Sequence, residues 1–209
     1  MRELSLNVMD VAQNSISAGA SLIGITVEEQ SQANTLSIRI EDNGKGMSPQ
    51  QVAQVQDPFY TTRTTRKVGL GIPFFRMAAQ MTGGNFSIRS QQGVGTWVEA
   101  NFFTNHIDMV PVGDMKETVL LLVITNPHLD FTYTRRRDQA AFTLDTRKLR
   151  VILGDVPLND PAVSTWLRGY LDEGEAELLR RRVLDRTLED FYKNLDETPG
   201  GELLADTLG

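Results

Sequence analysis

Apolar and polar positions repeat with two different periods along the first part of the chain. Residues 3–19 follow the period of a helix, and residues 22–28 and 35–41 follow the period of two that is typical of strands. In the second of these strands the residues alternate between aliphatic and polar from Leu36 to Glu41. The pattern predicts a helix followed by two half-buried strands.

Three more elements are expected before residue 105. Ser48 followed by Pro49 is typical of a helix N-cap and first turn. Residues 70–84 predict a helix that ends at paired glycines, and residues 85–103 predict a hairpin. Residues 57–69 follow neither period, so we expect a mobile loop there.

The chain is expected to divide into two α+β domains. Residues 1–105 contain the elements above, and residues 106–116, which include one proline and one glycine, predict a linker. Residues 117–209 are then a second, smaller domain.

This second domain contains three strand-like runs, at residues 118–125, 140–144 and 149–153. A helix is expected from Asp160 onward, because a proline follows that residue, and a charged helical segment follows it. The sequence of this part indicates no particular function.

Composition narrows the classes of protein that remain. With 209 residues, 40% of them hydrophobic, the chain is large enough for a core and too short for more than about two domains. It has no Cys and two His, which excludes a disulfide framework, a thiolate metal site and a cysteine nucleophile. Any metal would therefore need oxygen ligands.

Charge and hydropathy indicate which kinds of partner the protein is expected to have. No apolar run approaches the roughly 18 residues that cross a bilayer, so we expect a cytoplasmic protein without a membrane partner. The formal net charge of −6 argues against nucleic acid as a partner, because duplex binding needs a basic face. The "RRR" run at residues 135–137 either binds an acidic partner or forms a solvated strand edge.

The first helix carries a polar stripe. At about 100° per residue, one narrow arc contains Glu3, Asn7, Asp10, Asn14 and Ser17. A solvated helix face explains such a stripe, and for Glu3, at the helix start, that interpretation is kept. For Asp10 and Asn14, other segments of the chain favour a functional site.

Four motifs follow one another in a fixed order: "DVAQNSISAGA" at 10–20, "DNGKGM" at 42–47, "DPFYTTR…KVGLGI" at 57–72 and "GVGTW" at 93–97. Together they resemble the ATP-binding domain shared by gyrase, the ninety-kilodalton heat-shock chaperone, histidine kinases and MutL mismatch-repair proteins, the GHKL or Bergerat fold. The resemblance covers residues 1–105 and is greatest to histidine kinases, although "NSISAGA" is closer to MutL. It implies an α+β fold, a two-layer α/β sandwich that binds ATP.

The resemblance implies a role for the strand-end motif. Asp42 stands where the family's adenine-reading aspartate stands and would accept a hydrogen bond from the exocyclic amine, with Thr96 helping through water. Guanine has a carbonyl at that position, so the same carboxylate would select ATP over GTP. Gly44 and Gly46 would let the backbone pass close to the base and ribose. The alternative is a glycine turn capped by Asp42.

The resemblance also implies where the phosphates lie. Asn14 matches the family asparagine whose side-chain oxygen ligates Mg²⁺, a hard cation that suits an amide oxygen. Gly69, Leu70 and Gly71 match the place where the family's lid meets a helix N-terminus, whose free N–H groups bind phosphate.

Cations of the expected loop are a second group of candidate phosphate ligands. Arg63, Arg66 and Lys67 lie in the lid segment and would reach the β- or γ-phosphate. For each of them, a hydrated loop cation is the equally weighted alternative.

Asp10 departs from the family pattern. It lies one helical turn before Asn14, where hydrolysing and serine-phosphorylating relatives carry a glutamate as general base. Aspartate is one methylene shorter. It either orients water or a hydroxyl as a base, or only hydrogen-bonds the water shell of the magnesium ion.

Two functions remain open at this point. No His-(Asp/Glu)-x-x-(Thr/Asn)-Pro phosphoacceptor motif precedes the expected ATP domain, so we expect any acceptor in a separate protein. The first hypothesis is a Mg²⁺- and ATP-dependent ATPase or protein kinase that lacks its own phosphoacceptor domain. The second is a nucleotide-gated protein-binding switch with little turnover. A homodimer is compatible with both, and mismatch repair is a distant third.

Overall fold

The computed structural model describes residues 3–56 and 71–196, with side chains up to residue 180. The strands in this part of the chain are β1 (Leu22–Gln30), β2 (Thr35–Asp42), β3 (Asn85–Gln91), β4 (Gly95–Phe103), β5 (Asp130–Arg137) and β6 (Ala140–Asp145). The helices are α1 (Leu4–Ser17), α2 (Pro49–Val55), α3 (Gly71–Met81), α4 (Met115–Thr125), α5 (Thr146–Leu153) and α6 (Pro161–Asp196).

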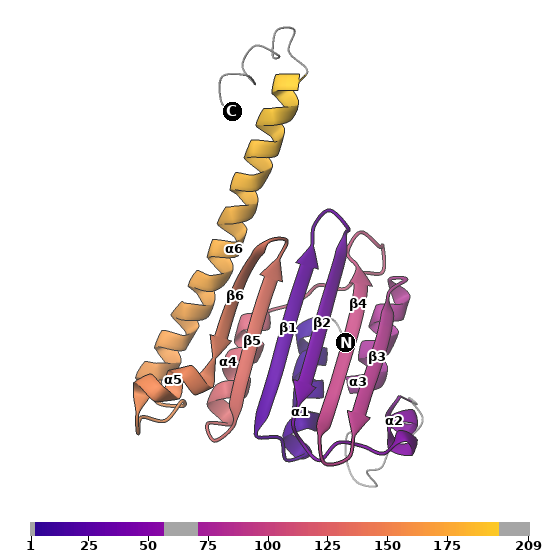
Figure 1. Ribbon diagram of the computed structural model, residues 1–209, viewed down its shortest axis with the longest axis vertical. Helices are drawn as coiled ribbons and strands as arrows, with labels where there is room; N and C mark the ends of the chain where they lie inside the picture. The colour runs from indigo at the N-terminus through magenta and orange to yellow at the C-terminus, as the bar shows by residue number, and fades with distance from the viewer. Residues whose placement is uncertain (1–2, 57–70, 197–209) are drawn as a thin grey trace.

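The six strands form one sheet in the order β3-β4-β2-β1-β5-β6 (Figure 1). Four of the five neighbouring pairs are antiparallel, and β1 pairs with β5 in parallel. The antiparallel β3–β4 pair is the hairpin that the sequence predicts at residues 85–103.

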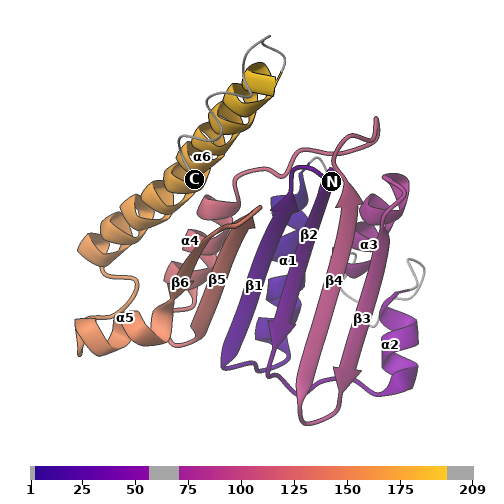
Figure 2. The same cartoon turned by 45° about the horizontal axis from the view of Figure 1, so that its top comes forward.

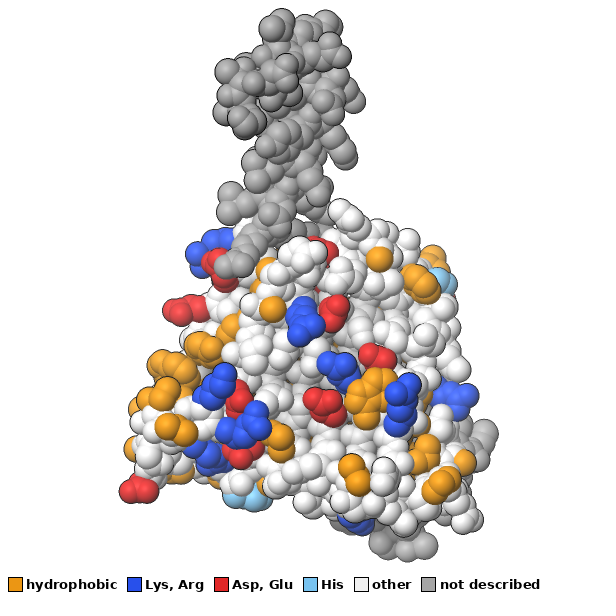
Figure 3. Space-filling view, in the orientation of Figure 1, with side chains coloured by type: hydrophobic (Ala, Val, Ile, Leu, Met, Phe, Trp, Pro, Cys, Tyr) orange, Lys and Arg blue, Asp and Glu red, His pale blue; other side chains and the backbone are white. Residues whose placement is uncertain are grey.

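Helices cover one face of the sheet. Helices α1, α3 and α4 lie behind the strands in both views, and α6 runs along the β6 side and continues beyond the sheet (Figures 1 and 2). The opposite face carries scattered charged side chains of both signs (Figure 3). This arrangement confirms the predicted two-layer α/β sandwich.

The core fills the space between these two layers. Alternate strand residues point at the helices, among them Ile25, Ile38 and Tyr133, which are all at most 2% exposed. Phe75 of α3 is fully buried, and its ring centroid lies 5.9 Å from that of Phe102. Alternation on the strands and the apolar faces of α1 and α3 therefore join the two layers at this part of the sheet.

Most predicted elements of the first part are confirmed. The short helix after the glycines begins as expected: Ser48 Oγ accepts from the Gln51 N–H (3.3 Å), and the Gln51 side chain accepts from the Ser48 N–H (2.9 Å). The predicted helix at residues 70–84 is α3, which ends before the paired glycines. The predicted mobile loop at residues 57–69 lies outside the described residues.

Two predicted strands of the second part are wrong. The run at 118–125 lies in helix α4, which begins where Asp114 accepts a hydrogen bond from the Glu117 N–H (2.8 Å). Helix α4 contacts α1, α6 and β5, so it is apolar around most of its circumference and shows no helical period. The run at 149–153 lies in helix α5, where Asp145 accepts from the Arg147 N–H (3.0 Å).

The "RRR" run forms the end of β5, a strand that the sequence pattern did not predict. Arg135 and Arg137 both pair with the carboxylate of Glu29 on β1, at 3.0 and 2.9 Å. Both arginine side chains are largely buried, so most of their surface is closed to an outside partner. Arg135 and Arg137 therefore serve the β1–β5 pairing, whereas the Arg136 side chain is 53% exposed and lies 3.8 Å from the Glu28 carboxylate.

The two parts of the chain share one sheet. Strand β5 pairs with β1 from Leu22–Asp130 to Glu29–Arg137. The predicted linker packs on α1, where the Leu4 N–H donates to the Pro111 carbonyl (3.0 Å). The division into domains at residues 1–105 and 117–209 stays a prediction, because a shared sheet does not say which part folds alone.

None of the described helices has the length and apolarity needed to cross a membrane, although α6 is 36 residues long.

Candidate functional site

The Asp42 carboxylate, at the end of β2, is held on both of its oxygens. Ser15 Oγ of α1 donates to Oδ2 at 2.5 Å, and the Gly44 N–H donates to Oδ1 at 2.9 Å. Asp42 itself is only partly buried. The two donors fix the direction of a carboxylate that still has open acceptor capacity.

Thr96 lies directly across from Asp42, since the two residues are paired in the β2–β4 ladder. The Thr96 and Ser90 hydroxyls are 2.9 Å apart, and Ser90 also accepts from the Met47 N–H at 2.8 Å. The end of the sheet and the glycine-containing turn after β2 are thus bonded to each other. Thr96 thus occupies the ladder position opposite Asp42, and its help through water stays a prediction.

Gly44 and Gly46 are both buried in this turn. A Cβ at Gly44 would lie 3.0 Å from Asp42 Oδ1 and 3.1 Å from the Ala18 Cβ. Gly46 has φ +63°, and a Cβ there would lie 1.9 Å from the Gln91 carbonyl oxygen. The turn itself therefore requires Gly46, in addition to any close approach by a ligand.

We expect Gly46→Ala to destabilise the protein far more than Gly93→Ala. Gly93 has a similar φ of +75°, but a Cβ there meets nothing within 4 Å. The left-handed backbone alone costs about 1–2 kcal/mol for alanine. The overlap at Gly46 forces a backbone shift, so its total cost should reach about 3 kcal/mol or more. Urea unfolding of both variants measures the difference, and equal losses would contradict the close packing of the turn.

Asp10 and Asn14 lie one turn apart on α1, and Asp10 lies against the start of α3. Asp10 is exposed and Asn14 is partly buried. A Cβ at Gly71, the first residue of α3, would lie only 2.6 Å from the Asp10 Cβ. Desolvation by the surrounding protein raises the pKa of the Asp10 carboxyl above its ordinary value.

A buried amide fixes the spacing of these two helices. In the orientation that satisfies both of its groups, the Asn7 side chain donates to the Glu3 carbonyl and accepts from the Phe75 N–H, each at 3.2 Å. Asn7 is 2% exposed, so losing either bond would leave a buried polar atom unpaired. This residue of the predicted polar stripe is therefore structural.

The structure brings most of the predicted site residues to one end of the molecule. Asp42, Gly44, Gly46 and Thr96 meet at the ends of β2 and β4. Asp10 and Gly71 meet between α1 and α3, with Asn14 one turn further along α1. Five predicted residues lie outside the described part of the chain: Arg63, Arg66, Lys67, Gly69 and Leu70.

Ser15 is the residue that sequence reasoning missed. It is 4% exposed and occurs with Val8 and Ala12 on the buried side of α1. The signal was a hydroxyl on the buried side of the helix, which needs a hydrogen-bond partner. Sequence alone could not show that this partner is Asp42, which is 27 positions away.

Comparison with known proteins agrees with this geometry. The profile of the family described as histidine kinase-, DNA gyrase B- and HSP90-like ATPase matches residues 1–106, which is 106 of the 209 residues. The chain belongs to this family. Its residues 1–106 are an ATP-binding, kinase-like ATPase domain.

Individual relatives match parts of the chain. The CAI-1 autoinducer sensor kinase/phosphatase CqsS of Vibrio cholerae is 33% identical over 96 residues, which cover 46% of this chain and 13% of that protein. The sensor protein kinase FleS of Pseudomonas aeruginosa is 34% identical over 89 residues, covering 43% and 22%. The chain thus spans less than a quarter of either kinase. The MutL ATPase domain of Aquifex aeolicus, solved with ADP, has a TM-score of 0.42 at 16% identity and covers 81% of this chain and 88% of that one.

Proposed function

We propose that the protein binds Mg²⁺·ATP at the end of β2 and either hydrolyses it or transfers its γ-phosphoryl group to a separate protein. The observation that best supports this proposal is the Asp42 carboxylate, which two donors hold in a fixed direction beside two buried glycines. An oriented anion is suited to the exocyclic amine of adenine. It would repel the carbonyl that guanine has at the same position.

The remaining residues fit the rest of the nucleotide. Asn14 offers an amide oxygen, the kind of hard ligand that Mg²⁺ accepts together with phosphate oxygens and water. Bound there, the ion would neutralise charge on the phosphates. Helix α3 is described from Gly71 onward, and the N–H groups of a first helical turn, which lack partners within the helix, are of the sort that bind phosphate.

Asp10 is the candidate base. Its raised pKa makes it a better proton acceptor than an ordinary aspartate, and it lies one turn from Asn14 and against the start of α3. In this role it would take the proton from an attacking water or from the group on the partner that accepts the phosphoryl. The alternative is a role in the water shell of the magnesium ion.

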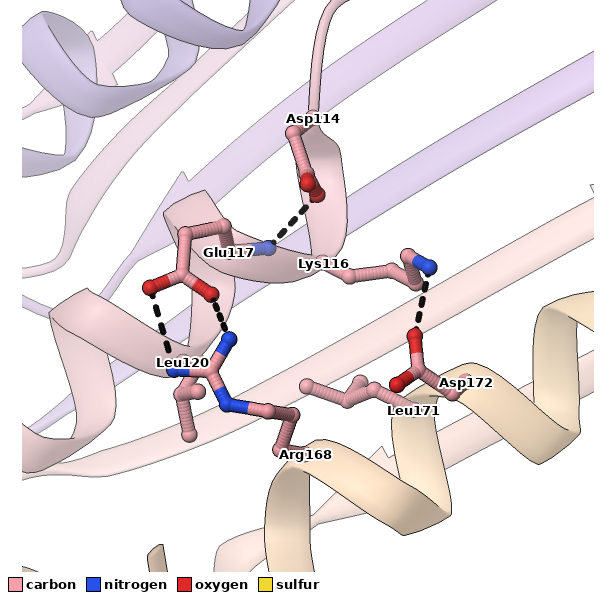
Figure 4. A pocket seen from close by; sticks show the side chains of 7 residues that line it. All are labelled: Asp114, Lys116, Glu117, Leu120, Arg168, Leu171 and Asp172. Atoms are coloured by element: carbon pink, nitrogen blue, oxygen red, sulfur yellow. Dashed lines mark hydrogen bonds and ion pairs between the residues drawn. The ribbon is translucent and has the colours of Figure 1, made fainter. Parts of the chain in front are cut away.

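A nucleotide-gated switch with little turnover is the second candidate function, and helix α6 is the feature that favours it. Helix α6 extends well past the sheet, where another protein could reach it (Figure 1). It is joined to α4 by two ion pairs, Arg168 with Glu117 and Lys116 with Asp172 (Figure 4). Helix α4 in turn packs on α1, so α1, α4 and α6 form one continuous set of contacts.

A melting experiment tests nucleotide binding in either case. ATP or ADP with Mg²⁺ should raise the melting temperature, because a ligand that binds only the native state stabilises it by about 2.7 kcal/mol at 100 times its Kd. For a chain of this size that corresponds to roughly 5–10 °C. GTP at the same concentration should give no shift. An equal shift with GTP would contradict the proposed adenine site.

A further inference from the structure

The Ser15–Asp42 bond joins two elements at the proposed nucleotide site. Ser15 is 4% exposed on α1, and its single hydroxyl proton is directed to Asp42 Oδ2 at 2.5 Å. Serines within helices often bond a carbonyl one turn back. Here the hydroxyl reaches across to the last residue of β2.

The geometry of this bond affects how Asp42 would recognise the adenine ring. A carboxylate can rotate about its terminal torsion, whose energy profile is broad. The Gly44 N–H restrains one oxygen of Asp42, and Ser15 restrains the other. With both restrained, the plane of the carboxylate is fixed before any ligand arrives, so no ordering of that side chain opposes binding.

We infer that Ser15 is a positioning residue that orients Asp42 for recognition of the 6-amino group of adenine. This inference rests on the proposed function. Ser15 touches no nucleotide in this role and acts through the carboxylate alone. Helix α1 then contributes twice to the same ligand: Asn14 would hold the magnesium ion at the phosphates, and its neighbour Ser15 fixes the carboxylate that recognises adenine.

Two ligands separate this role from general packing. The first is ATP, and the second is purine riboside triphosphate, which lacks the 6-amino group. Dissociation constants with Mg²⁺ are measured by titration calorimetry for the wild type and for Ser15→Ala. The variant should bind ATP about 10-fold more weakly, the effect of losing one hydrogen bond to a charged group. Its affinity for purine riboside triphosphate should change by less than about 3-fold, because that ligand does not use the oriented carboxylate.

Matched variants complete the test. Ser5→Ala removes a buried hydroxyl from the same helix, one that bonds the Glu3 carboxylate at 3.4 Å, and should leave both affinities unchanged. Ser15→Thr keeps the hydroxyl and should restore the preference for ATP. If Ser15→Ala does not fold, Ser15→Cys, with a similar shape and a weak donor, should show the same selective loss.

The outcomes distinguish this inference from the proposed function. A wild type that binds both ligands equally would overturn the adenine site and the role of Ser15 together. A wild type that prefers ATP, with a Ser15→Ala variant that keeps that preference, would overturn the role of Ser15 alone. Equal weakening of both ligands in the variant would also overturn it, because packing and not orientation would then explain the effect.

Discussion

Replacing Asp10 with asparagine should lower ATP turnover about 10²- to 10⁴-fold, the usual contribution of a positioned base. Asparagine keeps the size of the side chain and one acceptor oxygen but cannot take a proton. The dissociation constant of Mg²⁺·ATP should therefore change little. Phosphate release is measured with the protein alone and with candidate partner proteins. The protein by itself is expected to turn over ATP slowly if the phosphoryl acceptor is a separate protein.

Asn14→Ala provides the comparison for this experiment. It removes the proposed magnesium ligand, so it should weaken Mg²⁺·ATP binding as well as turnover. If Asp10→Asn leaves phosphate release unchanged in the most active mixture, Asp10 is not a base. If no mixture turns over ATP and a partner binds only with nucleotide, the switch replaces the enzyme as the preferred function.

The raised pKa of Asp10 predicts how the stability and the turnover of the Asp10→Asn variant differ from those of the wild type as the pH changes. Desolvation raises this pKa in the folded protein, so the ionised carboxylate destabilises the fold at neutral pH. That penalty disappears as the pH falls below the ordinary value of 3.8, where the carboxyl is protonated in both states. Asp10→Asn should thus be at least as stable as the wild type at pH 7. Wild-type turnover should fall at acidic pH as the Asp10 carboxylate is protonated. The residual turnover of Asp10→Asn should not show this fall.

Replacing Asp42 with asparagine should abolish the stabilisation of the protein by ATP. The Ser15 O–H and the Gly44 N–H donate to two different oxygens of Asp42, and an asparagine can present only one oxygen. One donor would then face an NH₂ group, and the negative charge that attracts the adenine amine would be lost. We expect affinity to fall at least about 100-fold, since hydrogen bonds to charged groups contribute roughly 1.5–3 kcal/mol each.

Glu41→Gln is the control for this prediction. Glu41 is the preceding residue of β2 and is exposed, so its replacement removes the same charge without touching the proposed site. Calorimetric titration with Mg²⁺·ATP should give nearly wild-type binding for Glu41→Gln and none for Asp42→Asn. Unimpaired binding by Asp42→Asn would show that the carboxylate does not read the base.

The local part of the site could be predicted from the sequence, because it depends on short spacings. Asp10 and Asn14 are one helical turn apart, and Asp42 with its two glycines forms a single turn. Their burial and spacing follow from the period of α1 and from the alternation of β2. The Ser15–Asp42 bond could not be predicted in this way, because it depends on how α1 packs against β2.

The second part of the chain was harder to predict for a related reason. A helix with neighbours on several sides loses its amphipathic period, so α4 has the continuous apolar pattern of a buried strand. Strand β5 is polar at Arg135 and Arg137 because both residues pair with Glu29, which precedes them by more than 100 positions. Neither neighbour is visible in the local sequence.

The parallel pairing of β5 with β1 has a practical consequence for anyone who shortens this protein. A fragment that ends at residue 105 would match the family domain but would lack β5, leaving β1 at the margin of a four-stranded sheet. The N–H and C=O groups that β1 shares with β5 between Leu22 and Glu29 would then be free. Such an uncovered strand is a template for pairing with other chains. Insolubility of that fragment would therefore reflect a lost neighbour and not a defect of the nucleotide site.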